Sequence, residues 1–321
     1  MPGVSPAAFR LPAGTALRYE RPAEQLARFL PSYAVLDSDV GLVDHKVNWM
    51  LPGRSQIWIR LTAGPITVAI GKRRYDPLQA AIMYGVTSRA MPVTAQGGIT
   101  VAIDVSPLGW ARFVKEDADK YCDQIVPLVQ LLPAEFVHDL AAALHASDRD
   151  LAVKQIVDDA FLRFLPAANP HEATIERMLE TFADPEVRDL SMATDRIGVS
   201  RKALLRLSHR YFGFSPKMIM MRSRFTRVIA SMLVQDGPVD HTAVPHGYYN
   251  VPHFLRDAGR FLAMTPRRFV LMDMPYTRAA LRAHRLVFPP SPADQAGIRS
   301  RLPSAASAAK ASPIASAIPL G

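Results

Sequence analysis

An internal repeat with an offset of 50 residues limits the fold of the second half of this chain more than any other feature. Apolar, basic, aromatic and hydroxyl–proline positions keep their order in both copies. The first copy consists of Leu204, Leu205, Arg206, Arg210, Tyr211, Ser215, Pro216 and Lys217, and the second of Phe254, Leu255, Arg256, Arg260, Phe261, Thr265, Pro266 and Arg267. Each copy follows a glycine, Gly198 or Gly247, that is preceded by a short segment able to form a helix. A helix, a turn with glycine and a second helix make up a helix-turn-helix, whose second helix enters the major groove of DNA.

The second helix of the first unit is predicted to begin after Ser200. A serine side chain at this position can accept a hydrogen bond from the backbone N–H of residue 202 or 203. Leu204 and Tyr211 then share one side of the helix. The other side carries Arg201, Lys202, Leu205, Arg206 and Arg210. A cationic face at the start of a helix suits contacts to phosphates and base edges, because a guanidinium can bind guanine O6 and N7 together.

The segment between the two copies predicts one long helix. Ser215 is a suitable cap, Pro216 fits the first helical position, and apolar residues recur in helical spacing as far as Leu233. About 19 residues at ~1.5 Å per residue give a rod of roughly 28 Å. This length approaches the ~34 Å between successive major grooves on one face of B-DNA. One polypeptide could therefore present two reading helices.

The charge of the chain is divided unevenly between two expected domains. A chain of 321 residues exceeds the usual size of one domain. Residues 187–288 carry 17 Lys and Arg against 6 Asp and Glu, whereas residues 1–186 carry 18 against 22. A basic half joined to a mildly acidic half indicates that one domain meets a polyanion. Residues 1–15 and 289–321 are rich in Pro, Ala, Ser and Gly and are predicted to be disordered.

Residues 16–184 are predicted to form a β-rich regulatory or sensory domain with closing helices. Short β-branched or aromatic runs, separated by Pro and Gly, indicate a small antiparallel sheet or barrel. These runs are HKVNWMLPG, QIWIRLTAG, ITVAIGK, AAIMYGVTS and ITVAIDVSP. Helical spacing follows in PAEFVHDLAAALHAS and DLAVKQIVDDAFLRFL. Asp184 and Pro185 mark the boundary with an all-α domain over 185–288, so the fold class is α+β.

The sequence favours no catalytic, cofactor or metal site. Cys122 is the only cysteine, which excludes an intramolecular disulfide and a zinc site with several thiolates. The segment GKRRYDP lacks the glycine spacing and the terminal Lys-Ser/Thr of a phosphate-binding loop. No stretch approaches the ~20 apolar residues needed to cross a bilayer, and the N-terminus has no signal-peptide core. We therefore expect a cytoplasmic protein that is not an enzyme, binds no cofactor or metal and does not act on membranes.

Two interpretations of the aromatic residues in the β-rich domain stay open. They could line an apolar pocket for an effector, or they could simply pack the core. The residues concerned are Trp49, Trp58, Trp110, Tyr84 and Phe113.

The basic half resembles the DNA-binding domain of the AraC/XylS family of transcription regulators. The resemblance extends over most of residues 187–272. It depends on Ser200, Leu204, Arg206, the segment Gly213 to Pro216, Gly247, Tyr248, Phe254, Arg256, Thr265 and Pro266. It implies that two reading helices enter adjacent major grooves. The residues that approach bases would be Lys202, Leu205 and Arg206 in the first unit and Val251, Pro252, Leu255 and Arg256 in the second.

Several positions of the second unit depart from the family pattern, among them Ala258 in place of a phenylalanine and Gly259 in place of a basic residue. Pro245 lies inside its expected first helix, where proline removes a hydrogen bond and clashes with the preceding turn. Pro252 is tolerated, because with Asn250 as the cap it falls in the first turn. Ala263 replaces the glycine that corresponds to Gly213, so a left-handed backbone there would cost roughly 1 kcal/mol or more.

We therefore expect a sequence-specific regulator that binds double-stranded DNA. The first unit should carry most of the base discrimination, while His253, Arg256 and Arg260 hold the phosphate backbone or touch thymine methyl groups. The alternative is a ligand- or protein-binding regulator whose degenerate second unit binds DNA mainly non-specifically. RNA polymerase, an unidentified small-molecule effector and a second copy of the chain are further candidate partners.

Overall fold

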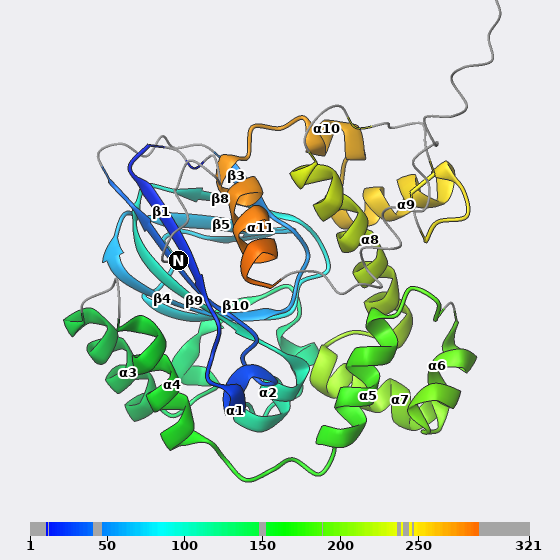
Figure 1. Cartoon of the computed structure of the whole chain (residues 1–321), viewed down its shortest axis with the longest axis horizontal. Helices are drawn as coiled ribbons and strands as arrows, with labels where there is room; N and C mark the ends of the chain where they lie inside the picture. The colour runs from blue at the N-terminus through cyan, green and yellow to red at the C-terminus, as the bar shows by residue number, and fades with distance from the viewer. Residues whose placement is uncertain are drawn as a thin grey trace, which may run out of the picture.

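The structure, a computed structural model, describes residues 11, 13–40, 47–147, 152–187, 189–235, 239, 244–245 and 247–288. The predicted disordered tail, residues 289–321, lies outside these residues, as do residues 1–10 and 12 at the other end. Figure 1 shows a β-rich domain on the left and a helical domain on the right, as the α+β prediction requires.

The β-rich domain contains two antiparallel sheets. The larger has the order β1 (Thr15–Glu20), β2 (Tyr33–Ser38), β9 (Gly98–Val105), β4 (Ser55–Ala63), β7 (Ala81–Tyr84) and β10 (Ile125–Pro127). The smaller has the order β3 (Val47–Met50), β8 (Met91–Ala95), β5 (Ile66–Ile70) and β6 (Arg73–Tyr75). The prediction of an antiparallel β-rich domain is confirmed, but among the described residues both sheets are open and no strand pairing closes a barrel. Five of these strands match the runs identified from the sequence, whereas β1, β2, β6, β8 and β10 lie outside those runs.

Alternating side chains hold the two sheets together. Along β5 every second residue is buried, as expected for a strand with one face on a core. Ile66, Val68 and Ile70 of this strand join Ile82 and Tyr84 of the larger sheet in one apolar cluster. The sheets therefore pack against each other through this cluster.

Helices cover the larger sheet and continue the chain toward the basic domain. They are α1 (Glu24–Ala27), α2 (Pro107–Phe113), the 3₁₀ turns η2 (Ala118–Tyr121) and η3 (Leu128–Gln130), α3 (Ala134–Ala146), α4 (Val153–Phe164) and α5 (Glu172–Ala183). Both helices predicted from the sequence appear as α3 and α4. Helix α5 ends just before Asp184 and Pro185.

The three tryptophans belong to three different apolar clusters. Trp110 is buried in the core beneath the larger sheet, Trp58 packs at the cluster between the sheets, and Trp49 packs against the second helix-turn-helix unit. They do not line one common pocket, so core packing accounts for them.

The helical domain follows the predicted order, with a linker helix between two units. Its elements are α6 (Leu190–Ile197), α7 (Arg201–Leu207), the π-helical turn η4 (Ser208–Phe212), α8 (Pro216–Val234), α9 (Val251–Leu262), α10 (Pro266–Val270) and α11 (Pro275–Val287). The linker α8 has 19 residues and is capped by Ser215, whose hydroxyl accepts from the Met218 N–H at 3.4 Å. The prediction of this helix is confirmed.

Both units pack directly on the β-rich domain. Its main core runs without a break into the first unit, through Leu204, Leu207, Tyr211, Phe212 and Ile219. The second unit meets the β-rich domain at Ala90, whose N–H donates to the carbonyl of Phe261 at 2.6 Å. The ring of Trp49 lies edge-on to Phe269, with centroids 6.0 Å apart.

The last helix returns to the β-rich domain. Helix α11 packs against β1 and β3 (Figure 1). The Thr277 hydroxyl donates to the carbonyl of Trp49 at 2.8 Å, and the ring of His284 lies edge-on to Tyr19. Both ends of the helical domain therefore pack against the N-terminal β-rich domain.

Arg222, in the middle of α8, ties the linker helix to the β-rich domain. Its guanidinium donates to the carbonyls of Gly53 at 3.1 Å and Thr87 at 3.0 Å. Burial lowers the pKa of this guanidinium to about 10, so it stays charged at neutral pH. One turn later the Thr226 hydroxyl donates to the carbonyl of Pro52 at 3.4 Å.

Replacing Arg222 should therefore destabilise the whole chain. Arg222→Met removes two charge-assisted hydrogen bonds from a buried interface, and we expect the free energy of unfolding to fall by about 2 kcal/mol. Urea denaturation of the full chain measures this. Lys217→Met, at an exposed position of the same helix, is the control. Equal stability of the two variants would show that the interface bonds contribute nothing.

Candidate nucleic-acid interface

The first unit has the geometry of a complete helix-turn-helix. Asp189 caps α6 by accepting from the Met192 N–H at 2.9 Å. Gly198 ends α6 in a left-handed conformation, with φ of +74°. The hydroxyl of Ser200 then accepts from the Ala203 N–H at 3.2 Å, which confirms the predicted cap of α7.

Side chains on α7 separate into a buried and an exposed side. Leu204 and Leu207 are buried. Ser200 and four residues of the predicted DNA-contacting set are exposed, namely Arg201, Lys202, Leu205 and Arg206. The first turns of α7 therefore present a cationic surface to solvent. Contact between this surface and DNA stays a prediction.

Two acidic residues of the β-rich domain pair with the end of the same reading helix. Arg210, the fifth predicted contact residue on this helix, places Nε 3.3 Å from the Asp117 carboxylate. His209 places Nδ1 3.6 Å from the Asp119 carboxylate. All four side chains are between 42% and 47% exposed, so water competes for both pairs and each is weak. The segment EDADK that precedes Tyr121 was the available sequence signal for this contact.

The cations of the first unit also act on His171, at the start of α5. Burial lowers the pKa of this imidazole, and the positive charges of Arg206 and Arg210 lower it further. Its Nδ1 lies 3.2 Å from the Tyr211 hydroxyl. His171 is therefore neutral at pH 7 and can share a hydrogen bond with the buried end of the reading helix.

The second unit differs from the first at its beginning. No described residue between Gln235 and Asn250 is helical, and residues 236–238, 240–243 and 246 lie outside the described part of the chain. At Val244 and Pro245, where the first helix was expected, the backbone forms no helix; the Tyr248 N–H donates to the carbonyl of Pro245 at 3.1 Å. This agrees with the effect of a proline inside a helix.

The second reading helix, α9, is nevertheless well anchored. Asn250 caps it by accepting from the His253 N–H at 2.8 Å, and Pro252 falls in the first turn, as predicted. The ring of Phe261 stacks on Phe225 of α8, with centroids 5.0 Å apart. Direct packing on the linker thus holds α9 in place.

Polar side chains near the start of α9 bond to one another. The Tyr248 hydroxyl donates to the Asp257 carboxylate at 2.9 Å, and the Arg224 guanidinium lies 3.1 Å from the same group. Nε2 of His253 lies 3.3 Å from Arg224. Burial and the Asp257 charge raise the pKa of Tyr248, so its hydroxyl keeps the proton. His253, which was predicted to hold phosphate, is engaged within the protein.

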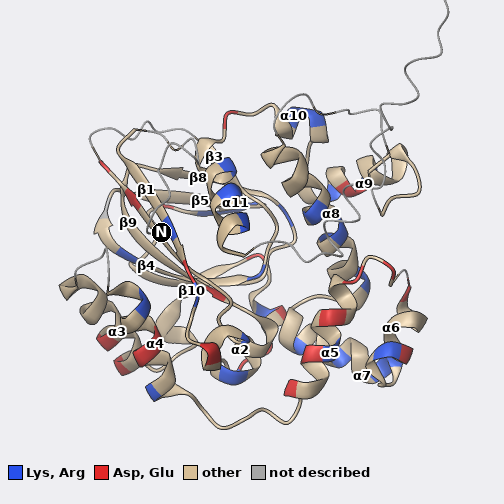
Figure 2. Ribbon diagram, viewed as in Figure 1, with Lys and Arg blue, Asp and Glu red and all other residues tan. Residues whose placement is uncertain are grey.

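The remaining predicted residues of α9 lie on its outer side. Pro252, Leu255, Arg256 and Arg260 are exposed and Val251 is half-buried. The Arg260 guanidinium also lies 3.7 Å from the sulfur of Met218. Tyr249, which sequence reasoning missed, is 90% exposed beside the cap. Figure 2 shows Lys and Arg on α8 and α10 and around α7, in the same half of the molecule.

The two reading helices end in the same way, as the sequence repeat predicts. Gly213 and Ala263 are both left-handed, with φ of +77° and +56°. Ser215 and Thr265 then cap the following helices, and each cap precedes a proline. The predicted strain at Ala263 is therefore present, because alanine rarely adopts this conformation.

Within the described residues no group of three or more His, Cys, Asp or Glu side chains could hold a metal ion. No helix in the same part of the chain is long and apolar enough to cross a membrane.

Comparisons with known proteins identify the helical domain. Residues 193–271 match the family model of a helix-turn-helix domain. Among solved structures, ToxT from Vibrio cholerae is 9% identical with a TM-score of 0.42, covering 80% of this chain and 97% of that one. The AraC-like transcriptional activator CuxR is 10% identical with a TM-score of 0.24, covering 68% and 88%. A sequence search of curated proteins finds no match. At these scores the structural likeness carries no argument about ligands or activity.

The geometry and the family match together define a DNA-binding helix-turn-helix domain. It is of the AraC type, the class found in transcription regulators rather than in enzymes. The resemblance noticed in the sequence is thereby confirmed for residues 193–271.

Relieving the strain at Ala263 should stabilise the protein. Ala263 is exposed, so Ala263→Gly removes an unfavourable left-handed Cβ without opening a cavity, and we expect a gain of about 1 kcal/mol. Ala142→Gly, at an exposed position inside α3, should instead lose about 1 kcal/mol. Thermal unfolding of both variants tests this. Lower stability of the Ala263→Gly variant would contradict the assignment of strain at Ala263.

Proposed function

We propose that this protein is a sequence-specific transcription regulator that reads adjacent major grooves of duplex DNA with α7 and α9. The observation that carries the proposal is the repeated pair of capped helices, each with an exposed arginine at the same position, Arg206 and Arg256. The 19 residues of α8 correspond to roughly 28 Å at the usual rise of a helix. A rigid spacer of this length is suited to hold two reading helices near the ~34 Å period of the duplex.

The β-rich domain is proposed to control this activity by direct contact. Asp117 and Asp119 lie against the end of the first reading helix, and Ala90 bonds to the end of the second. A change in the β-rich domain would therefore alter either the positive charge that the first unit presents to DNA or the relative position of α7 and α9. RNA polymerase contact and homodimer formation stay predictions from the family resemblance.

A candidate opening for an effector is present in the described part of the β-rich domain. A pocket of about 320 Å³ lies between α3 and α4. Phe136, Leu140, Ile156 and Phe164 supply its apolar wall, and its charged groups are Arg163, Glu135 and Asp139. This composition suits a small amphipathic molecule.

The proposed function is tested by selecting preferred duplexes from a random pool with the full chain. Binding of the selected and scrambled duplexes is then compared at two salt concentrations. We expect a preference for the selected sequence and affinity that falls steeply with salt, because released counterions drive binding. Equal affinity for both duplexes would favour the alternative of a ligand- or protein-binding regulator with non-specific DNA contacts.

The two equivalent arginines should differ in their effect on base preference. We expect Arg206→Ala to reduce discrimination at its contacted bases by about 10- to 100-fold, because a bidentate arginine–guanine contact distinguishes bases strongly. Arg256→Ala should weaken all duplexes by similar factors. Binding to a panel of single-base variants measures both effects, and greater relaxation by Arg256→Ala would reverse the assignment.

Removing the carboxylate at Asp117 should strengthen DNA binding. Asp117→Asn releases Arg210 for a phosphate contact, so we expect a several-fold higher affinity. The slope of log affinity against log salt should steepen by about 0.9 for one added phosphate contact. Asp139→Asn, an exposed position on α3, makes the same change of charge away from the reading helices. If both variants gain the same affinity for DNA, the change in net charge alone accounts for the gain.

A further inference from the structure

The first two turns of α9 offer very few free hydrogen-bonding side chains. The side-chain oxygen of Asn250 accepts the capping bond from His253. His253 is turned toward Arg224, and Asp257 is buried and bonded to Tyr248. The Asn250 oxygen, His253 and Asp257 are therefore engaged in holding the helix itself, and Arg256 is the exposed cation of these two turns.

Apolar side chains occupy the exposed positions instead. Leu255 is 46% exposed, Pro252 is exposed and Val251 is half-buried. Tyr249 is 90% exposed, an unusual state for a large aromatic residue. We call Tyr249, Val251, Pro252 and Leu255 the apolar reading surface.

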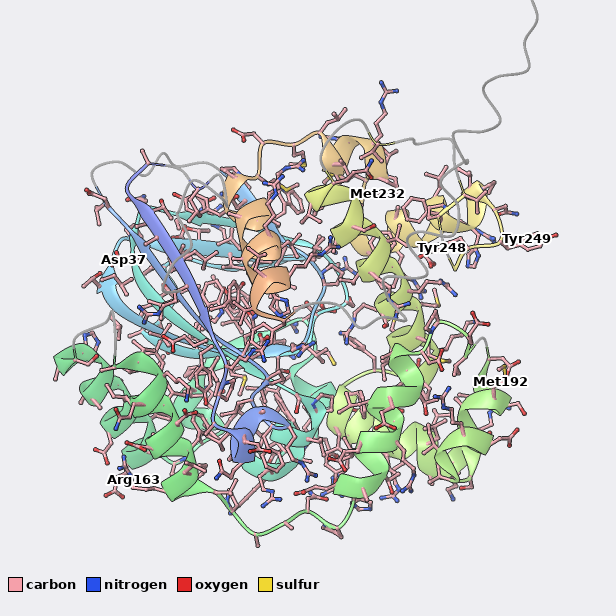
Figure 3. All side chains as sticks on the ribbon, viewed as in Figure 1. Asp37, Arg163, Met192, Met232, Tyr248 and Tyr249 are labelled. Carbon is pink, nitrogen blue, oxygen red and sulfur yellow. The ribbon has the colours of Figure 1, made fainter. Side chains whose placement is uncertain are left out.

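The backbone beneath Tyr249 is fixed on both sides. Tyr248 is buried, and its ring lies edge-on to those of His253 and Phe254, with centroids 5.0 and 5.1 Å away. Asn250 is held by its capping bond. Figure 3 shows Tyr248 turned inward and Tyr249 pointing outward from the edge of the molecule. The exposed ring is thus presented from an ordered position at the start of the reading helix.

The equivalent surface of the first unit is chemically different. Arg201, Lys202 and Arg206 are exposed there, and Leu205 is the exposed apolar residue among them. Two helices that occupy the same place in a repeat therefore present different chemistry to DNA. The first presents three cations around one leucine, whereas the second presents Arg256 beside a mainly apolar surface.

Thymine is the base whose major-groove edge carries a methyl group, and apolar side chains recognise it by contact. We propose that the apolar reading surface recognises thymine methyl groups, so that the half-site under α9 is selected for its thymines. This inference rests on the proposed function and names the DNA chemistry that the second unit reads. It assigns to the apolar side chains the thymine contacts that the sequence led us to expect from His253, Arg256 and Arg260.

The inference is tested with the full chain and a duplex selected as above. Thymines are replaced by deoxyuridine, which removes only the 5-methyl group, in one half-site at a time. We expect binding to weaken about fourfold for each contacted methyl in one half-site, the value that follows from burying one methyl-sized group. Replacement in the other half-site should have little effect.

Protein variants connect the effect to the surface. Leu255→Ala and Tyr249→Ala should bind more weakly and should distinguish thymine from deoxyuridine less than the unchanged chain does. Leu271→Ala removes a 71% exposed leucine outside α9 and should keep full sensitivity. Sensitivity that is equal in the Leu255→Ala, Tyr249→Ala and Leu271→Ala variants would overturn the inference.

The outcomes also separate this inference from the proposed function. A preferred duplex whose affinity is unchanged by deoxyuridine in either half-site would sink the inference and leave the function standing. Absence of any preferred duplex would overturn both.

Discussion

The arrangement of this protein depends on the packing of both helix-turn-helix units against one β-rich domain. The main core passes from the larger sheet into the first unit at Leu204 and Tyr211. The second unit is held at Ala90 and Trp49, and Arg222 fixes the helix between them. Because burial of apolar surface is the largest favourable contribution to folding, these two apolar clusters hold the units to the β-rich domain more strongly than surface ion pairs could. The relative placement of the reading helices is therefore a property of the whole chain.

The two units support their reading helices in different ways. In the first, α6 covers the reading helix and Gly198 makes the turn. In the second unit, no described residue between Gln235 and the cap Asn250 is helical, and Phe225 of the linker packs directly on α9. The polar groups near the start of α9 have become part of its support. That use of Asp257 and His253 explains why the exposed side of α9 is left to apolar residues and two arginines.

Contacts at the ends of the reading helices link the β-rich domain to the DNA-binding surface. Arg210 and His209 meet carboxylates at η2, and these pairs are solvated enough to be exchanged for phosphate. The Cys122 thiol donates to the carbonyl of Gly213 at 2.8 Å, beside the same turn. At Gly213 an added Cβ would lie 2.4 Å from Val86, so glycine is required there by close approach as well as by conformation. A small movement of the segment around η2 would consequently change the contacts at the end of the first reading helix.

The sequence by itself determined α6, α7, α8 and α9 and most of the exposed residues of the helical domain. Caps, prolines after caps and the 50-residue offset are local signals, and they placed Ser200, Asn250 and the full length of α8 correctly because capping and helical spacing depend on near neighbours. Only the tertiary structure decided which of those residues stay free. Arg210 meets Asp117 and His253 meets Arg224 across long stretches of chain, and α11 returns to β1 and β3. Such contacts depend on how separate elements pack, which no local pattern records.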